Sequence, residues 1–524
     1  MARRLAIDVP TVLSVLYAPL QPIVKRLHIV RRGSRRFDPD DINLPAGYAA
    51  DVVASGLTAP VHVCFDPDGV AYVTESGHKS DSAPRVVRVD PVSGELRTVV
   101  DLTDRWTTTG AATGAAWHDG GLIIANTDSL LRADPATGEV TELVGGLPGL
   151  GDHQTNHPLV GPDGRVYWGQ GSATNMGVVG ADNFGYEWLA AHPEVCDVPA
   201  EDVELVGRNY DVPNVLGNPL TSVQSGAFVP FGTPTTAGQA IAGNPKANGA
   251  ILSCLPDGSD LRVVAWGLRN PYGVAFAPDG RLYATEHGSD ERGARFIVGD
   301  PDDLYEIRDG AWYGWPDFAS GIRLDDPHWG DGGQGREPVL ARFPDPDPPK
   351  PVTSFESHAA ANGLDFSRDE SFGFVGQAFV ALFGDLAPVT TARQVVPAGF
   401  KVVRVDPTTG TIRDFAVNRV QGPASKLFHG GFERPSHVAF GPDGALYVVD
   451  FGQIKIALEK GGIRMQQGTG ALWRIRRIGG PASELPEPSK TVPFYPIQAG
   501  VVVALVAGGV AAVVAILRRL MRGR

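Results

Sequence analysis

The stretches 60–77 (PVHVCFDPDGVAYVTESG), 271–288 (PYGVAFAPDGRLYATEHG) and 435–452 (PSHVAFGPDGALYVVDFG) repeat one phrase along the chain. Each copy holds a short apolar strand, an Asp-Gly step and a second strand of alternating apolar residues. Asp-Gly tolerates the positive φ angles of tight hairpin turns, so each copy predicts a β-hairpin. Further copies, the last two of them weaker, lie at 157–172 (HPLVGPDGRVYWGQGS), 117–126 and 363–384.

A second phrase accompanies the first and also predicts hairpins, at 86–100, 130–143 and 401–415. Six copies of the first phrase, each able to supply part of a four-stranded sheet, predict an all-β fold, a six-bladed β-propeller. A pair of β-sandwiches would explain the strands but not the repeat. The longest interruption is the loop-like segment 173–248, and inserted loops at one mouth of a propeller are where we expect function.

Composition agrees with a strand-rich fold. The 524 residues include 65 Gly and 43 Pro, too many for long helices. Only three cysteines are present, which excludes a disulfide scaffold.

The net charge of −13 is unevenly distributed. Residues 1–36 carry +7 and residues 490–524 carry +5, which leaves −25 for 37–489. An acidic body repels nucleic acid and suits metal cations, whereas basic ends suit anionic lipid. Nucleic acid is therefore excluded as a leading partner.

The C-terminal region predicts a membrane anchor. Residues 497–517 contain no charge, and at ~1.5 Å per residue a helix of this length crosses a bilayer core. We expect a linker at 479–492, a single transmembrane helix at 493–517 and a cytoplasmic basic tail at 518–524. The positive-inside rule then places the propeller, 37–478, outside the cytoplasm at the cell membrane. Residues 1–36 predict a signal-like or membrane-surface segment, although Asp8 and Pro10 interrupt its apolar run.

Two loop segments hold candidate catalytic side chains. Residues 151–158 (GDHQTNHP) precede a predicted strand, and a histidine here can act as a base near neutral pH. Residues 266–271 (WGLRNP) offer Arg269, whose planar fork suits an oxyanion or a carboxylate, and Asn270, which both donates and accepts. The alternatives are a surface histidine and an arginine paired with the acidic body.

Acidic, glycine-flanked loops at 286–293 (EHGSDERG), 301–305 (PDDLY) and 313–316 (YGWP) provide carboxylates and main-chain carbonyls. Such a ligand set suits a hard cation such as Ca²⁺, although its spacing differs from that of an EF-hand. A solvated acidic loop is the alternative.

The run GLRNPYGVAFAPDGRLYATEHG, followed by DERG, PDDLYEI and AWYGWPDF and preceded by DHQTNHPLVGPDGRVYWGQGSATN, resembles the glucose/sorbosone dehydrogenase family. These are six-bladed propellers that use pyrroloquinoline quinone (PQQ), and the likeness covers roughly residues 45–478. It implies hydride transfer from an aldose or related aldehyde to the quinone with help from Ca²⁺. An anchored enzyme of this kind would pass its electrons to a respiratory acceptor.

The resemblance also implies roles for individual residues. His153 is similar to the catalytic base and Arg269 to the arginine that stabilises the reduced quinone. Asn270, Gln154 and Arg434 are similar to cofactor contacts. The metal ligands that it implies are Gly288 and Ser289 for a quinone-bound Ca²⁺ and Asp302 and Asp303 for a structural Ca²⁺, and His358 matches a family histidine.

Three stretches depart from the family pattern. Small residues (TTTGAATGAAW, 107–117) replace a family glutamine, Asn156 and His157 stand where the family has an arginine after the base histidine, and FGDLAP (383–388) replaces a polar run. A Ca²⁺-dependent lactonase-type hydrolase, using Glu75, Asn175 and Asp450, and a non-catalytic binding propeller that has lost the quinone are the alternative functions.

Overall fold

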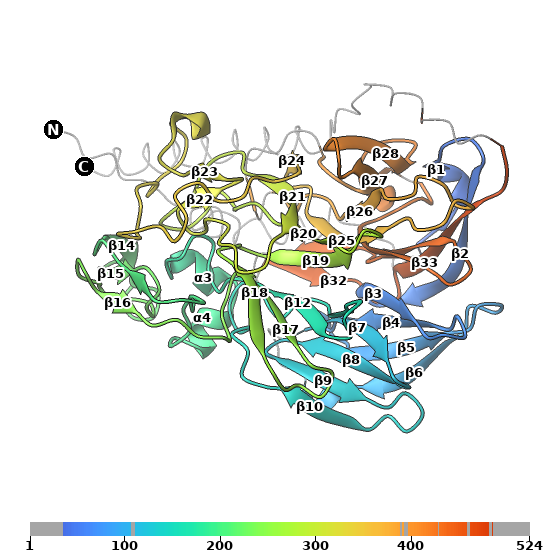
Figure 1. Ribbon diagram of the computed structural model, residues 1–524, viewed down its shortest axis with the longest axis horizontal. Coiled ribbons are helices and arrows are strands. Elements are labelled where there is room, and N and C mark those ends of the chain that lie inside the picture. Colours follow the sequence, from blue (N-terminus) through green and yellow to red (C-terminus); the bar gives the residue numbers. More distant parts are fainter. Residues whose placement is uncertain are drawn as a thin grey trace, which may run out of the picture. The chain divides into compact units, whose positions relative to one another are not determined.

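The computed structural model describes residues 35–105, 111–387, 390–391, 397–427, 429–457, 462–480 and 485. The described residues belong to one compact unit, Arg35–Glu487. It contains six antiparallel sheets of at least four strands, and the innermost strands of successive sheets pack against one another in a closed cycle. The predicted all-β six-bladed propeller is therefore confirmed (Figure 1).

Each sheet is one blade, and within a blade the strands follow chain order from the axis outward, apart from β1 and β2. The first blade consists of β3 (Pro60–Phe65), β4 (Ala71–Glu75), β5 (Arg85–Val89) and β6 (Leu96–Asp101). The second consists of β7 (Ala112–His118), β8 (Gly121–Asn126), β9 (Ser129–Ala133) and β10 (Val140–Val144). The third consists of β11 (Leu159–Val160), β12 (Val166–Gln170), β17 (Ala250–Cys254) and β18 (Arg262–Trp266). The fourth blade consists of β19 (Pro271–Phe276), β20 (Leu282–Glu286), β21 (Pro301–Ile307) and β24 (Thr353–Ser357). The fifth consists of β25 (Ala361–Phe366), β26 (Ala378–Leu382), β27 (Lys401–Asp406), β28 (Thr411–Asn418) and the short edge strand β1 (Ile42–Asn43). The sixth consists of β29 (Pro435–Phe440), β30 (Leu446–Asp450), β33 (Gly470–Arg477) and β2 (Tyr48–Leu57).

The repeated phrases occupy fixed places in the blades. The first phrase forms the inner hairpin, as in β3–β4 and β29–β30, and the second forms the outer hairpin, as in β5–β6. In the first turn Gly69 N donates to Asp66 O at 3.0 Å, and Gly69 has φ +84°. Only the glycine of the Asp-Gly step adopts the left-handed conformation, so the turn is a type I turn followed by a glycine bulge.

The N-terminal strand β2 closes the ring by pairing with β33 over its full length. Just before it, the buried Arg35 side chain forms an ion pair with the buried carboxylate of Asp450 and donates to the carbonyl of Gly431 at 2.7 Å. The first described residues are therefore tied to the last blade.

The remaining elements belong to insertions and connections. The third blade carries α3 (Ala181–Gly185), α4 (Trp188–Ala191), β13 (Val203–Glu204), β14 (Asn209–Pro213), β15 (Ser222–Gly226) and β16 (Ala240–Ile241) between β12 and β17. Two more hairpins are β22 (Phe318–Ala319) with β23 (Ile322–Arg323), and β31 (Ile454–Ala457) with β32 (Gly462–Met465). Four short helical segments are η2 (Pro39–Asp41), η3 (Thr103–Arg105), η4 (Pro327–Trp329) and α5 (Ala424–Leu427).

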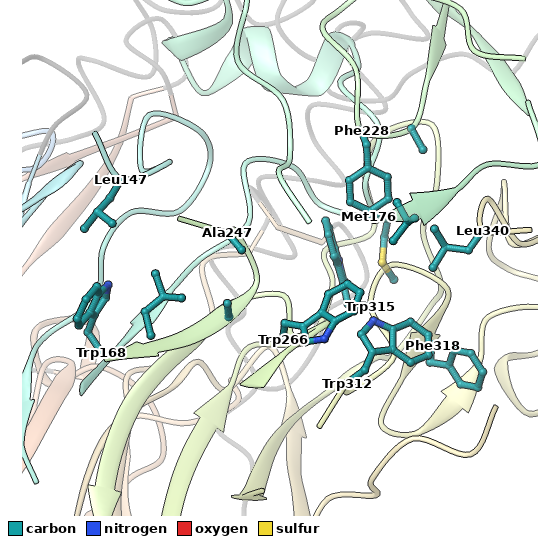
Figure 2. Close-up of a cluster of buried hydrophobic side chains, with 14 of the residues drawn as sticks. Leu147, Trp168, Met176, Phe228, Ala247, Trp266, Trp312, Trp315, Phe318 and Leu340 are labelled. Carbon is teal, nitrogen blue, oxygen red and sulfur yellow. The ribbon is translucent and has the colours of Figure 1, made fainter. Parts of the chain in front are cut away.

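A large apolar cluster holds the insertion against the third and fourth blades (Figure 2). Trp266, Trp312 and Trp315 meet there with Met176 and Phe228 from the insertion. Trp315 Nε1 also donates to the carbonyl of Asn175 at 3.3 Å. This packing gives the loops at the mouth of these blades a rigid support.

Within the described residues, no helix combines the length and the apolar character needed to cross a membrane. The predicted anchor at 493–517, its tail at 518–524 and residues 1–34 lie outside the described residues, so the structure gives the anchor no support. All three cysteines are free thiols.

Candidate active site

A cavity of about 290 Å³ opens on the propeller axis. Every blade contributes at least one residue of its innermost strand, or of the segment leading into that strand, to the lining, among them Val61, Thr113, Asn156, Tyr272, Asn362 and Ser436. Loops at the ends of the strands complete the wall. Its volume and its mixed polar and apolar lining suit a small ligand.

His153 lies in the wall of this cavity, in the loop before β11. Its Nδ1 is 2.9 Å from the carbonyl oxygen of Ser172, so Nδ1 carries the proton and Nε2 is the basic nitrogen. Burial, with the nearby charge of Arg269, lowers the pKa of His153 well below its usual value. The imidazole is therefore neutral at physiological pH, as a general base requires.

Ser172 connects this base to the predicted arginine. Its main-chain N–H donates to the carbonyl of Arg269 at 2.7 Å, while its own carbonyl accepts from His153. Gly171 lies close to both His153 and Asn270, with no room for a side chain between them. An added Cβ would lie 2.3 Å from His153 Cβ and 2.6 Å from Asn270 Oδ1. The structure thus brings together the predicted residues His153, Arg269 and Asn270.

The Arg269 guanidinium is almost completely buried and bonds to the neighbouring loops. Nη1 donates to the Gly288 carbonyl at 2.9 Å, Nη2 donates to Asn175 Oδ1 at 3.0 Å, and Nη2 lies 3.5 Å from a carboxylate oxygen of Asp290. The carbonyl predicted to bind the quinone-associated Ca²⁺ is therefore in contact with the predicted catalytic arginine.

A chain of amide and imidazole groups crosses the floor. Asn156 Nδ2 donates to Asn270 Oδ1 at 3.0 Å, Asn270 Nδ2 donates to His287 Nδ1 at 2.9 Å, and His287 Nε2 donates to Asn362 Oδ1 at 3.0 Å. Tyr272 stacks on His287 with the ring centroids 5.2 Å apart. This chain fixes the orientation of Asn270 and the neutral tautomer of His287.

A second cation, Arg292, lies in the wall and was not among the predicted site residues. It pairs with Asp152 at 2.6 Å, with Asp182 at 2.5 Å and with Asp290 at 3.0 Å, and it lies over the Tyr186 ring. The DERG stretch was predicted to provide metal ligands only. An arginine within a run of acidic residues was the available signal for this ion-pair network.

A small second cavity of about 30 Å³ lies beside Arg269 and Gly288, with three buried carboxyl groups in its lining. Burial raises the pKa values of Glu286 and Asp303 to about 8 and that of Asp300 to about 6. Oε2 of Glu286 is buried without a hydrogen-bond partner. Carboxylates and carbonyls around a space of this size can bind a hard cation.

Three of the four predicted metal ligands line the two cavities, whereas Ser289 lines neither and donates its main-chain N–H to a carboxylate oxygen of Asp300 at 2.5 Å. Asp303 lines the small one, where its carboxylate accepts from Ser320 at 2.7 Å and from Ser354 at 2.5 Å. Asp302 lines the large one and accepts from the main-chain N–H of Gly288 at 2.9 Å. Gly288 lines both.

Of three further residues that the family resemblance singled out, two line the large cavity and one does not. Gln154 lines the large cavity. His358 also lines it, with its buried Nε2 unpartnered. Arg434 is not among the lining residues; its guanidinium donates to the carbonyls of Gly384 and Asp385 and lies over two phenylalanine rings.

Part of the wall is an apolar cluster, with side chains from the first, fifth and sixth blades: Val61, Ala360, Phe383, Leu386, Phe451, Ile454 and Met465. Leu386 and the small residues Ala111–Thr113 stand where the family pattern places polar groups. The cavity lining therefore combines polar groups with an apolar cluster.

Glu75, Asn175 and Asp450, the residues considered for a lactonase-type metal centre, do not come together. None lines the large cavity, and each carries its own hydrogen bonds: Glu75 with Thr58 N, Asn175 with Arg269 and Asp450 with Arg434 N. The structure therefore gives no support to a hydrolytic centre built on these three residues.

Comparison with known proteins shows similarity to sugar dehydrogenases. Residues 234–453 match the model of the glucose/sorbosone dehydrogenase family. Quinoprotein glucose dehydrogenase B of Acinetobacter calcoaceticus is 23% identical over 295 residues, which are 51% of this chain and 52% of that protein. The chain thus spans about half the length of this curated relative.

Among solved structures, a Trichoderma reesei protein of carbohydrate-active enzymes family AA12 aligns with a TM-score of 0.52 and 15% identity, over 85% of this chain and 100% of its own. The PQQ domain of pyranose dehydrogenase from Coprinopsis cinerea aligns with a TM-score of 0.50 and 18% identity, over 85% and 98%. The chain shares its fold with these proteins, and its residues 234–453 are similar to the glucose/sorbosone dehydrogenase family.

Proposed function

We propose that this protein is an oxidoreductase of the glucose/sorbosone dehydrogenase family, which oxidises an aldose or a related aldehyde with PQQ and Ca²⁺. The observation that carries the proposal is the neutral His153, tied through Ser172 to Arg269 in the wall of an axial cavity. The resemblance of the family motifs and the family match at residues 234–453 support it.

The cavity suits the cofactor. Its volume of about 290 Å³ is close to the lower end of the range for cofactor sites. The apolar side chains Phe383 and Phe451 suit a planar ring, and the polar side chains Arg269, Asn270 and Gln154 line the same cavity, where they suit the quinone and carboxylate oxygens. The Gly288 carbonyl would bind the Ca²⁺ associated with the quinone.

When bound, PQQ would supply the two-electron acceptor for the substrate hydride. The protein would hold the substrate hydroxyl within reach of His153, whose Nε2 accepts its proton. Arg269 would stabilise negative charge on an oxygen of the cofactor, a role that its burial strengthens. The small cavity with Asp303 would bind the second, structural Ca²⁺.

The test uses purified full-length protein treated with a chelator. PQQ is titrated with and without Ca²⁺ while the melting temperature is followed, and dye reduction is then measured on a panel of aldoses and aldehydes. We expect a Ca²⁺-dependent thermal shift with PQQ and substrate-driven dye reduction. His153→Ala should abolish the reduction, whereas His328→Ala, at an exposed histidine, should preserve it.

Stabilisation by Ca²⁺ without any response to PQQ would overturn this function. That outcome would favour the alternative of a binding propeller without the quinone, for which the missing polar contacts near Leu386 and Ala112 are the supporting observation.

We also propose that the uncharged run at 497–517 anchors the protein in the cell membrane, with the propeller outside the cytoplasm and its electrons passing to a respiratory acceptor. Carbonate extraction of membranes tests the attachment. Full-length protein should stay in the pellet, and a chain truncated after residue 489 should be released.

A further inference from the structure

The innermost strands place one equivalent residue from each blade around the axis. The third residue of each strand is His62 in β3, Gly114 in β7, Gly273 in β19, Gly363 in β25 and His437 in β29. In the third blade the equivalent residue is His157, which, like His62 and His437, precedes the turn glycine by seven positions. Three histidines and three glycines thus occupy the six equivalent positions.

These residues form the layer next to the cavity floor. The residue that precedes each of them lines the cavity, from Val61 in the first blade to Ser436 in the last. The strand register shifts between the first and third residues, for example between Pro60 and His62 and between Pro435 and His437. These bulges change the direction in which the third side chain points.

The three imidazoles meet although they come from the first, third and sixth blades. The ring centroids of His62 and His437 are 3.9 Å apart, those of His62 and His157 are 4.7 Å apart, and those of His157 and His437 are 5.0 Å apart. Side chains of the third and sixth blades, which lie across the ring from each other, can touch only at the axis. The cluster therefore lies in the central channel.

Two of the three glycines, Gly114 and Gly363, provide space for the rings. A Cβ at Gly114 would lie 2.2 Å from His157 Cβ and 2.9 Å from His62 Cγ, and a Cβ at Gly363 would lie 2.1 Å from His437 Cδ2. Any side chain at either position would displace an imidazole. Each of these two glycines therefore leaves room for a histidine ring of a neighbouring blade.

Four of the six ring nitrogens lack hydrogen-bond partners. His62, His157 and His437 are 6%, 2% and 5% exposed, and Nδ1 of His62, Nδ1 of His437 and both ring nitrogens of His157 are buried without a hydrogen bond. Each unsatisfied buried polar group costs about 1–3 kcal/mol. One ligand nitrogen from each residue lies within 4.8 Å of the others.

We propose that His62, His157 and His437 bind one divalent first-row transition-metal ion, such as Zn²⁺, in the central channel beneath the cavity. Three imidazoles with a fourth position open are a common ligand set for such ions, whereas Ca²⁺ requires oxygen ligands.

Metal binding would draw the rings together. Metal–nitrogen bonds of about 2.0–2.1 Å in a tetrahedral site bring the nitrogens to about 3.4 Å from one another. The ion would then link the inner strands β3 and β29 to the segment before β11. This site is separate from the proposed quinone and Ca²⁺ sites, because none of the three histidines lines either cavity.

The test is metal analysis of full-length protein purified without a histidine tag. Elemental analysis of the isolated protein, and of apoprotein reloaded with Zn²⁺ in excess Ca²⁺, should give about one transition-metal ion per chain. His437→Gly, which copies the residue found in three other blades, should lower the occupancy at least tenfold. His328→Gln removes an exposed histidine and should leave the occupancy unchanged.

Two further measurements keep the result decisive if the variant misfolds. Co²⁺-loaded wild-type protein should show the intense visible absorption of a four-coordinate site, and X-ray absorption of the Zn²⁺ form should show three imidazole ligands. Asp303→Asn, in the proposed Ca²⁺ site, should not change Zn²⁺ uptake. Folded wild-type protein that takes up less than a tenth of an equivalent of Zn²⁺ and Co²⁺ would overturn the proposal, and so would uptake through oxygen ligands alone.

Discussion

The carbonyl oxygen of Ser172 accepts a hydrogen bond from Nδ1 of His153 at 2.9 Å, and this contact determines which nitrogen of the imidazole is basic. The same residue holds Arg269 through its N–H at 2.7 Å. The distance between the candidate base and the candidate arginine is therefore set by one short main-chain link. Small changes in this link should affect the chemistry more than the stability.

Gly171→Ala tests this link. The new Cβ would lie 2.3 Å from His153 Cβ and 2.6 Å from Asn270 Oδ1, although the backbone at this position does not require glycine. We expect dehydrogenase activity to fall about 100-fold, the size of effect that follows when a catalytic group moves by about 1 Å. Steady-state kinetics and the melting temperature are the measurements.

Gly185→Ala is the matched control, because no atom lies within 4 Å of its added Cβ. It should leave both quantities unchanged. Full activity in Gly171→Ala would show that the position of His153 is not critical.

The pH profile should report the environment of His153. Burial, together with the positive charges of Arg269 and Arg292, lowers its pKa well below 6.5. Activity requires the unprotonated base, so the acid limb of kcat/KM should lie well below pH 6.5. Arg292→Gln removes a positive charge, which raises the pKa of His153 and moves the limb to higher pH.

Arg292→Lys keeps the charge and should restore the position of the limb. A limb that stays in place in Arg292→Gln would mean that another group controls the profile. Profiles of all three proteins between pH 4 and 9 decide between these results.

The buried carboxyl groups of the small cavity should make the metal-free protein less stable at high pH. The pKa of Glu286 rises from 4.5 to about 8 in the folded chain, and that of Asp303 also rises to about 8. The folded state therefore favours the protonated acids, and their stabilisation is full below about pH 4 and is lost as pH rises towards 8. Each group changes stability by up to about 1.4 kcal/mol per pH unit in this window.

Calorimetry in a chelator should show a melting temperature that falls between pH 5 and pH 8. Ca²⁺ should raise it most at pH 8, because the cation binds the ionised carboxylates. Glu286→Gln should weaken the pH dependence. A Ca²⁺ effect of the same size at pH 5 and pH 8 would contradict binding at these groups.

Arg35 and Arg36 offer a comparison of neighbouring cations. The Arg35 side chain is 2% exposed and pairs with a fully buried Asp450, whereas the Arg36 side chain is 68% exposed. Arg35→Ala leaves a buried carboxylate without its cation and should cost about 3–5 kcal/mol. Arg36→Ala should cost less than about 1 kcal/mol. Denaturant unfolding measures the free energy of unfolding of both variants. Equal losses in the two variants would exclude a stabilising role for the Arg35–Asp450 ion pair.

Much of the fold could be predicted because its hairpins repeat in sequence. The turn at Asp66–Gly69 and its equivalents are local features, so their residues identify them without tertiary information. The short helices α3 and α4 could not be predicted, because no helical periodicity marks them. A small apolar cluster within the 173–248 insertion, which includes Trp188 and Leu189 of α4, stabilises them.

The candidate site could be predicted only in part. His153, Arg269 and Asn270 stand in recognisable motifs, and the structure brings them together. The role of Arg292 depends on contacts with Asp152, 140 residues away, which no local pattern reveals. The three axial histidines could have been found by aligning the hairpins on their turn glycines, since all three occupy the same column.

The pairing of β2 with β33 has a consequence for biosynthesis. The last blade needs a strand that the ribosome makes more than 400 residues before its partner. Until then the nascent chain carries an unpaired ten-residue edge, a surface open to wrong pairing with other chains. Chaperone dependence during synthesis should therefore concentrate on this edge, and it should end once β33 emerges.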